Sequence, residues 1–255
     1  MFSSKTIFTA MATIGFASLL AFGGFSTATA RTDLAAANTQ TTKSLTGEAP
    51  IQLMHVHGLA YSADGKQLFI PSHHGIAIYA DGQWAKMPGP EHDYMGFSAT
   101  RNALYSSGHP AAGSNLANPF GLIKSTDAGK TWQQLALKGE SDFHTLATGY
   151  ETNAVYVLNS RPNTRMPQAG LYMTQTDGMA WTRSATNGLR SKVNALAVHP
   201  RDANVVAVGA ADGLYLSRDA GNHFEPLIQG TQVLAQWFDL DSEQLWVSSY
   251  ADSPA

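Results

Sequence analysis

The segment Ser125-Thr126-Asp127-Ala128-Gly129-Lys130-Thr131-Trp132 decides the fold that we expect for this chain. It predicts a tight hairpin turn in which the Asp127 carboxylate accepts backbone N–H bonds and Gly129 adopts a positive φ. The aromatic residue that ends the segment is expected to turn inward and anchor the hairpin in the core. Residues 217–224 repeat the pattern with Phe in place of Trp. Residues 174–181 repeat it with the Asp one place late, and residues 80–84 keep a shortened form.

These turns belong to a longer repeat that begins near residue 54. Comparable strand starts lie at His57, Met95, His144, Asn194 and Leu234, at steps of 38, 49, 50 and 40 residues. Periods of about 40–50 residues that each carry several short strands are typical of β-propeller blades.

Each repeat has the same internal order of four expected strands. A first strand such as residues 54–61 comes before a turn and a buried apolar strand such as residues 68–70. The third strands are expected at residues 75–79, 121–125, 170–174 and 213–217, and the fourth follows the tight turn. We therefore expect an all-β protein, a β-propeller of about five four-stranded antiparallel blades, or six in a longer parent chain. The last blade is incomplete, because residues 231–255 supply two strands, and residues 44–52 are the candidate for completing it unless the chain is a fragment.

Several segments besides the turns point to a known group of proteins. They are HVHGLA at 55–60, SHHG at 72–75, NPFGLIKSTDAGKTW at 118–132 and DFHTLA at 142–147. With the turns, they resemble the BNR, or Asp-box, propellers: sialidases, xyloglucanase-type glycosidases, the sortilin-type ectodomain and a bacterial glycosylhydrolase-like group. The resemblance covers the chain from about residue 51 onward and implies the propeller fold. It says little about function, because in such propellers the boxes lie away from the ligand face.

Composition narrows the class of function. The 255 residues carry a formal net charge of −3 and no basic run, so a nucleic-acid partner is not expected. Cysteine is absent, which excludes disulfides and thiolate metal ligands. Any metal site must therefore use imidazole, thioether, carboxylate or backbone ligands.

The first residues predict export of the protein. Lys5 is followed by an apolar stretch and by Ala28-Thr29-Ala30, a pattern that signal peptidase accepts, so residues 1–30 are expected to be a signal peptide. Residues 31–50 are expected to form a flexible leader, and residues 51–255 the propeller domain. We expect a periplasmic or secreted protein with no membrane association after signal cleavage.

Histidine is concentrated in one part of the repeat. Seven of the nine His residues lie between residues 55 and 144. If the first strands are regular, residues two apart share a face, so a row through His57, Met95 and His144 and a row through His55, Asp93 and Asp142 are expected to line one channel. His73, His74, His92, His109 and Arg161 are expected in binding loops at the same end, although His73 and His74 should face opposite ways. Blades one to three thus carry a candidate site that blades four and five lack.

Three functions remain open from the sequence. In the first, His55, His57, Met95 and His144 bind a transition metal, Cu or Zn, and the methionines favour copper. In the second, Asp93 and Asp142 are the acid and base of a glycoside hydrolase. In the third, the long loops at 108–120 and 159–170 hold a protein partner and the propeller is a non-catalytic assembly module. The expected ligand is accordingly a metal ion, a glycan or a protein.

Overall fold

A computed structural model describes residues 51, 53–241 and 244–250 as strands, turns and irregular segments. The expected signal peptide, the leader, and nearly all of the strand expected at residues 44–52 lie outside these described residues. Among the described residues there is no helix long and apolar enough to cross a membrane.

The described residues form five antiparallel sheets, which we call blades one to five in chain order. Blade one contains β1 (Ala60–Tyr61), β2 (Leu68–Ser72), β3 (Gly75–Ala80) and β4 (Gln83–Lys86). Blade two contains β5 (Asp93–Ala99), β6 (Leu104–His109), β7 (Leu122–Ser125) and β8 (Gln133–Ala136). Blade three contains β9 (Leu146–Thr148), β10 (Val155–Asn159), β11 (Gly170–Thr174) and β12 (Thr182–Arg183). Blade four contains β13 (Val193–Val198), β14 (Val206–Ala210), β15 (Gly213–Ser217) and β16 (Glu225–Gln229), and blade five contains β17 (Gln232–Phe238) and β18 (Leu245–Tyr250).

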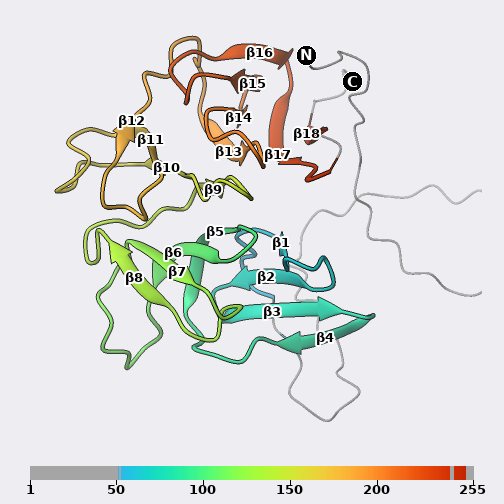
Figure 1. Cartoon of the computed structure of the whole chain (residues 1–255), viewed down its shortest axis with the longest axis vertical. Helices are drawn as coiled ribbons and strands as arrows, with labels where there is room; N and C mark the ends of the chain where they lie inside the picture. Colours follow the sequence, from blue (N-terminus) through green and yellow to red (C-terminus); the bar gives the residue numbers. More distant parts are fainter. Residues whose placement is uncertain (1–50, 52, 242–243, 251–255) are drawn as a thin grey trace, which may run out of the picture.

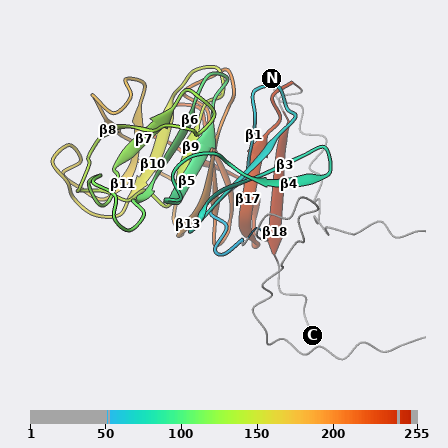
Figure 2. The same cartoon turned by 90° about the horizontal axis from the view of Figure 1, so that it is seen from below.

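The arrangement is the β-propeller predicted from the sequence. Figure 1 shows β5, β9, β13 and β17 near the middle of the molecule and β4, β8, β12 and β16 at its periphery. The first four blades have four strands each, whereas β17 and β18 form a separate pair, visible in Figure 2. Among the described residues β18 has no second strand partner, so blade five is incomplete, as predicted.

The core lies between the blades. Four apolar clusters occur, one at each contact between successive blades, and the cluster of blades three and four includes Tyr156, Val206 and Phe224. The middle strands of blades two to four are apolar on both faces because each of these blades has a neighbour on both sides; every residue of β14 is buried. Burial of this kind supplies about 25 cal/mol per Å² of apolar surface, and it is the main source of stability in a chain without disulfides.

The first strands of blades one and three differ from the prediction. β1 covers only Ala60–Tyr61 and β9 only Leu146–Thr148, so the histidines of these blades lie before the strands and not on them. His55 has a φ of 53°, which is incompatible with an extended strand. Among these three blades, only β5 carries its candidate residues, Asp93 and Met95, on the first strand itself, and its register shifts directly after Met95. The expected alternation of faces therefore cannot be applied across the three blades.

The tight turns form as the sequence predicts. The Asp127 carboxylate accepts hydrogen bonds from the Thr131 backbone N–H at 2.9 Å and from the Thr131 hydroxyl at 2.6 Å. Ser125 Oγ accepts the Gly129 N–H at 2.8 Å, and Trp132 Nε1 donates to the Gly129 carbonyl at 3.0 Å. Residues 217–224 repeat this network through Ser217, Asp219 and Gly221.

The degenerate turn of blade three uses its displaced carboxylate elsewhere. Thr176 Oγ1 accepts the Ala180 N–H at 2.9 Å and so replaces the missing Asp inside the turn. Asp177 instead accepts hydrogen bonds from Tyr105 at 2.7 Å and from Lys124 at 2.9 Å, both of blade two. A shift of one residue thus converts a bond within one turn into a bond between two blades.

Candidate functional site

Two kinds of connection lie at opposite ends of the blades. Because neighbouring strands are antiparallel, the turn between β2 and β3 and the loop between β6 and β7 lie at the end where the first strands begin. The tight turns between the third and fourth strands lie at the other end. We call these the histidine end and the turn end; seven histidines at residues 55–144 belong to the loops and strand starts of the histidine end.

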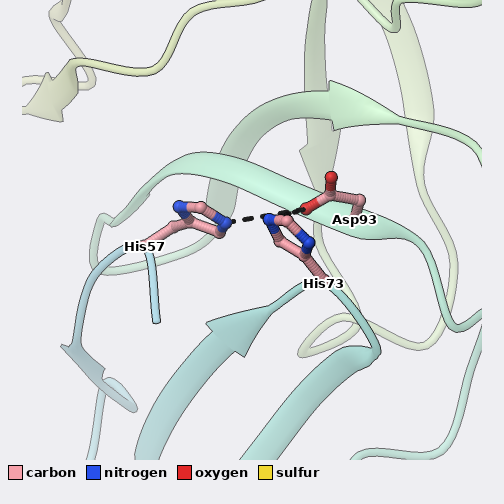
Figure 3. Close-up of side chains that lie close together, drawn as sticks. All are labelled: His57, His73 and Asp93. Atoms are coloured by element: carbon pink, nitrogen blue, oxygen red, sulfur yellow. Dashed lines mark ion pairs between the residues drawn. The ribbon is translucent and has the colours of Figure 1, made fainter. Parts of the chain in front are cut away.

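The histidine end holds a compact group of three side chains, His57, His73 and Asp93. The Nε2 atoms of His57 and His73 lie 3.7 Å and 3.8 Å from Asp93 Oδ1 (Figure 3). One potential ligand atom from each residue lies within 4.8 Å of the other two, and among the described residues this is the group of His, Asp and Glu with that property. Blade one supplies both imidazoles and blade two supplies the carboxylate.

The polar atoms of this group lack ordinary partners. His57 Nε2 and Asp93 Oδ1 are both buried, and neither makes a hydrogen bond within the described residues. Burial lowers the pKa of His57, and the nearby imidazoles of His73, His144 and His55 lower it further, against the raising effect of Asp93. The neutral imidazole, which is the form that binds metal ions, is therefore favoured.

His55 supports the group from the solvent side. Its ring stacks on His73 with centroids 4.6 Å apart and an interplanar angle of 16°. The His73 ring in turn stacks on His57 at 4.9 Å, so three imidazoles form one column. The positive φ of His55 is a costly conformation for a residue with a side chain, of the order of 1 kcal/mol. The backbone thus holds His55 beside the group at a local cost.

A second group lies next to the first. His109 Nε2 lies 3.2 Å from Asp142 Oδ2, and His144 Nε2 lies 2.6 Å from the same oxygen. His109 is the residue paired directly with Asp93 across β5 and β6, so the two groups adjoin. The effect of His144 on the pKa of His57 is a second sign of their proximity.

The backbone fixes this adjacency. A Cβ atom on Gly108 would lie 2.0 Å from the Asp93 carbonyl oxygen, so only glycine lets β6 approach β5 this closely beside His109. The Phe143 N–H donates to Ser107 Oγ at 2.9 Å, and Ser107 donates to the Gly121 carbonyl at 2.7 Å. These bonds hold the segment of Asp142 and His144 against the end of β6.

Other predicted residues have different surroundings. His92 is buried; its Nδ1 accepts the Ala111 N–H at 2.9 Å, and its ring packs edge-on to Phe120 at 5.0 Å. His74 is exposed and lies near Glu91. Met95 is buried and Arg161 is exposed, and neither has a described contact with the two groups. The structure thus brings together His55, His57, His73, Asp93, His109, Asp142 and His144.

The sequence did not single out Asn118 as a residue of the candidate site. Its Oδ1 lies 2.7 Å from His109 Nδ1, so the long loop at 108–120 folds back on its own first histidine. Asn118 lies nine residues after His109, a spacing that matches no strand or turn pattern. The contact between the two residues depends on the course of the irregular loop that joins them. The Asn-Pro pair that ends the loop is the sequence feature that could have drawn attention to it.

Comparison with known proteins supports the fold. No family model and no curated protein match the chain. Among solved structures, it is similar to a GH74 enzyme from Niastella koreensis, with 16% identity, a TM-score of 0.56 and coverage of 77% of this chain and 33% of that one. It is similar to a gluconolactonase from Xanthomonas campestris, with 16% identity, a TM-score of 0.54 and coverage of 78% and 72%. The extracellular domain of a protein titled a hybrid two-component system, from B. thetaiotaomicron, has 16% identity, a TM-score of 0.51 and coverage of 83% and 27%.

These neighbours are β-propellers, and the likeness at this identity concerns the fold alone. The chain spans about a third of the length of the GH74 enzyme. The function has to be argued from the side chains of the histidine end.

Proposed function

We propose that this propeller binds a divalent first-row transition-metal ion, Zn(II) or Cu(II), through His57, His73 and Asp93. The observation that carries the proposal is the grouping of three potential ligand atoms, all within 4.8 Å of one another, on two adjacent blades. Two ligands of a tetrahedral ion bound at 2.0–2.1 Å lie about 3.3 Å apart. The distances of 3.7 Å and 3.8 Å to Asp93 need only a small contraction to reach that value.

The unpaired polar atoms support the same proposal. A buried polar atom without a hydrogen bond costs about 1–3 kcal/mol, so its presence calls for a partner. His57 Nε2 and Asp93 Oδ1 are two such atoms and point toward one another. A cation between them would satisfy both atoms. Two imidazoles and a carboxylate suit Zn(II) and Cu(II), and exposure of the His73 side chain, 36%, leaves access for the ion.

The ligands that we propose differ from the residues that the sequence suggested as metal ligands. His57 stays as a ligand, while His73 and Asp93 take the places that the sequence suggested for Met95 and His144. His55 acts as the stacking support of His73. The sequence favoured copper because of possible methionine ligands. The proposed site contains a carboxylate and no methionine, so it does not favour copper over zinc.

The arrangement favours metal binding over glycoside hydrolysis. In a glycosidase the two carboxylates face each other across the sugar. Here Asp93 faces His57 and His73, whereas Asp142 faces His109 and His144. Each carboxylate thus belongs to its own imidazole pair. The long loop at 108–120, first considered for a protein partner, contributes Asn118 to the same end.

We further propose that the protein is an exported Asp-box propeller. The sequence pattern of residues 1–30 supports export, and the repeated bonds of Asp127 and Asp219 support the Asp-box relationship. N-terminal sequencing of the protein isolated from the periplasm or medium of a Gram-negative expression host tests export. A new N-terminus at Arg31 is expected, and an intact N-terminus confined to the cytoplasm contradicts it.

The metal proposal is tested by calorimetric titration of Zn(II) and Cu(II) into chelator-treated, untagged protein. The double variant His57→Ala/His73→Ala should lose one bound ion per chain relative to the wild type. His74→Ala is the matched control, because it removes the neighbouring imidazole of the same dipeptide and should leave binding unchanged. Equal stoichiometry and affinity in the double variant and the wild type would overturn the proposal. A panel of chromogenic glycosides, hydrolysed by the metal-free wild type but not by Asp93→Asn, would favour the glycosidase instead.

A further inference from the structure

We infer that two copies of this chain pair through β18 and build one four-stranded blade from their two-stranded halves. The strand order of the shared blade is β17 and β18 of one copy followed by β18 and β17 of the other, related by a twofold axis. This pairing is independent of the metal site proposed for blades one and two. It is carried by the free edge of β18, by the absence of charge along that edge, and by the exposed aromatic residues of blade five.

The second strand of blade five has a free edge where the other second strands have a neighbour. In blades one to four, β2, β6, β10 and β14 each pair with a strand on both sides. Within the part of the chain that the structure describes, β18 pairs with β17 alone. Figures 1 and 2 show β18 on the outer side of β17. The backbone N–H and C=O groups along this edge can therefore accept a further strand from outside the ring.

The free edges of the other blades have features that hinder pairing with another chain. β4 and β8 have four residues each, β12 has two, and β16 carries Glu225 and Pro226. Short strands, charges and proline are the usual protection of sheet edges. β18 has six residues, Leu245–Tyr250, and none of them is charged or proline. Of these edges, β18 is thus the one best suited to pair with another chain.

Blade five is held in place independently of this edge. On one face, Val233, Phe238 and Val247 are buried in the apolar cluster shared with blade four. The Gln236 side-chain amide donates to the Ala195 carbonyl of blade four at 3.0 Å. A partner strand therefore meets a preformed edge, and association does not have to order the blade first.

The opposite face of blade five exposes aromatic side chains. Trp237 and Trp246 lie directly opposite each other across β17 and β18, and Tyr250 lies on the same face as Trp246. Their exposed fractions are 49%, 36% and 57%. A single exposed apolar residue is ordinary, whereas a group of exposed Trp and Tyr side chains is typical of a surface that binds another protein.

The spacing of these aromatic residues fits β18 to a second β18. If the twofold axis passes through Ser248, antiparallel pairing places Trp246 of each copy directly opposite Tyr250 of the other. Aromatic pairs across an antiparallel ladder are favourable, and the two small Ser248 side chains meet at the axis. Two strands from each copy also give four strands, the number in each of blades one to four.

The leader of the same chain fits this edge less well. Residues 44–50 have the sequence SLTGEAP, which contains Gly, Glu and Pro, three residue types that are depleted in strands. They also provide no aromatic side chain to pair with Trp246 or Tyr250. Closure of blade five by these residues is the alternative that the experiments below distinguish from pairing of two copies.

A single introduced cysteine tests the register, since the chain has no cysteine of its own. In Ser248→Cys the two Cα atoms lie about 4.5–5.5 Å apart across the axis, a distance that a disulfide can span. Mild oxidation should therefore convert most of the purified protein into a covalent dimer on a non-reducing gel. Ala235→Cys is the matched control, because Ala235 is the exposed cross-strand partner of Ser248. Its two copies lie roughly 14 Å apart, three strand spacings, and should not be linked. Equal cross-linking in the two variants, or none in Ser248→Cys, would overturn the inference.

Sedimentation equilibrium measures the pairing without a cross-link. In chelator, which prevents a metal ion from bridging two chains, the wild type at micromolar concentration should have twice the mass of one chain. Ser248→Lys brings two like charges together at the axis and should raise the dissociation constant of the dimer by about 10-fold or more. Ala235→Lys adds the same charge one strand further from the axis on each copy and should change this constant less than about threefold.

Folding of each variant is established by circular dichroism and urea unfolding. A wild type that is monomeric at micromolar concentration would overturn the inference. Hydrogen exchange would then identify what covers the edge, since protection of the β18 amides in a monomer that is lost on deletion of residues 31–50 would indicate closure by the leader.

Discussion

The turn end and the histidine end belong to the same blades but follow opposite rules. At the turn end, residues 125–132 and 217–224 make the same hydrogen bonds in two different blades. At the histidine end, equivalent positions differ from blade to blade. Blade one has His57 beside Asp93, whereas in blade four Asn194 donates to the Val233 carbonyl at 3.0 Å and so joins two blades. The comparison teaches that repetition marks the scaffold, and departure from repetition marks the candidate site.

The largest expected effect on stability comes from a substitution at the turn end. Gly129 has a φ of 86°, and a Cβ there would lie 2.2 Å from the buried Met87 Sδ of blade one. Gly129→Ala should therefore lower the free energy of unfolding by about 2–4 kcal/mol, through left-handed backbone strain and overpacking. Gly82→Ala is the control, since Gly82 has a φ of 75° but no atom within 4 Å of the added Cβ, and should cost only about 1–2 kcal/mol. Urea unfolding measures the stability of both variants. Equal losses of unfolding free energy would show that the contact of residue 129 with Met87 does not contribute.

The next effect concerns the histidine end and depends on metal. Zn(II) at 100 times its dissociation constant should raise the free energy of unfolding by about 2.7 kcal/mol through the proposed site. His57→Ala/His73→Ala should lose this increment. In chelator the same variant should differ from the wild type by less than about 1 kcal/mol, because the removed rings are partly exposed and their ligand atoms lack hydrogen bonds. A loss of several kcal/mol in chelator would mean that these histidines are structural.

A smaller effect at the turn end depends on pH. Hydrogen bonds from the Thr131 side chain and backbone, and from Ser125, lower the pKa of Asp127 to about 2. The unfolded chain has a value of about 3.9, so the native state is stabilised above that pH and loses the contribution as the pH falls toward about 2. Asp127→Asn should unfold at lower urea than the wild type at neutral pH, and the difference should shrink below about pH 3. Asp81→Asn in the shortened turn is the control, and a difference independent of pH would contradict the charged role of Asp127.

The smallest expected effect on stability concerns the turn of blade three, whose aspartate bonds to the neighbouring blade. Asp177 is bonded to Lys124 and Tyr105 of the neighbouring blade and not within its own turn. Asp177→Asn should cost at most about 1 kcal/mol, and the loss should diminish at high salt, because the pair is partly exposed. Thr176→Val, which removes the acceptor used inside the turn, should be insensitive to salt. Urea midpoints at low and high ionic strength compare the two variants.

The sequence predicted the scaffold closely because local patterns set it. Third strands were expected at residues 170–174 and 213–217, and both appear with these bounds. A hairpin turn is specified by neighbouring residues, so eight residues suffice to recognise it. The first strands of blades one and three were predicted too long, since the apolar residues after His57 and His144 gave no sign of the irregular backbone before them.

The candidate site could be predicted only as a region. The concentration of histidine in the first three blades was visible in the sequence. The pairing of His57 and His73 with Asp93 was not, because His57 and Asp93 lie 36 residues apart and meet through the packing of two blades. Similarly, nothing in the sequence placed His92 among aromatic side chains and His109 beside Asn118.

The sequence by itself determined the all-β class, the blade repeat, the chemistry of the turns and the absence of thiolate ligands, since each of these follows from residue types at short spacing. The tertiary structure alone decided which imidazoles meet which carboxylate, because the angle between blades and the course of irregular loops depend on the whole core. Short-range order is encoded by backbone preferences of neighbouring residues, whereas a site shared by three blades exists only once long-range packing has placed them side by side.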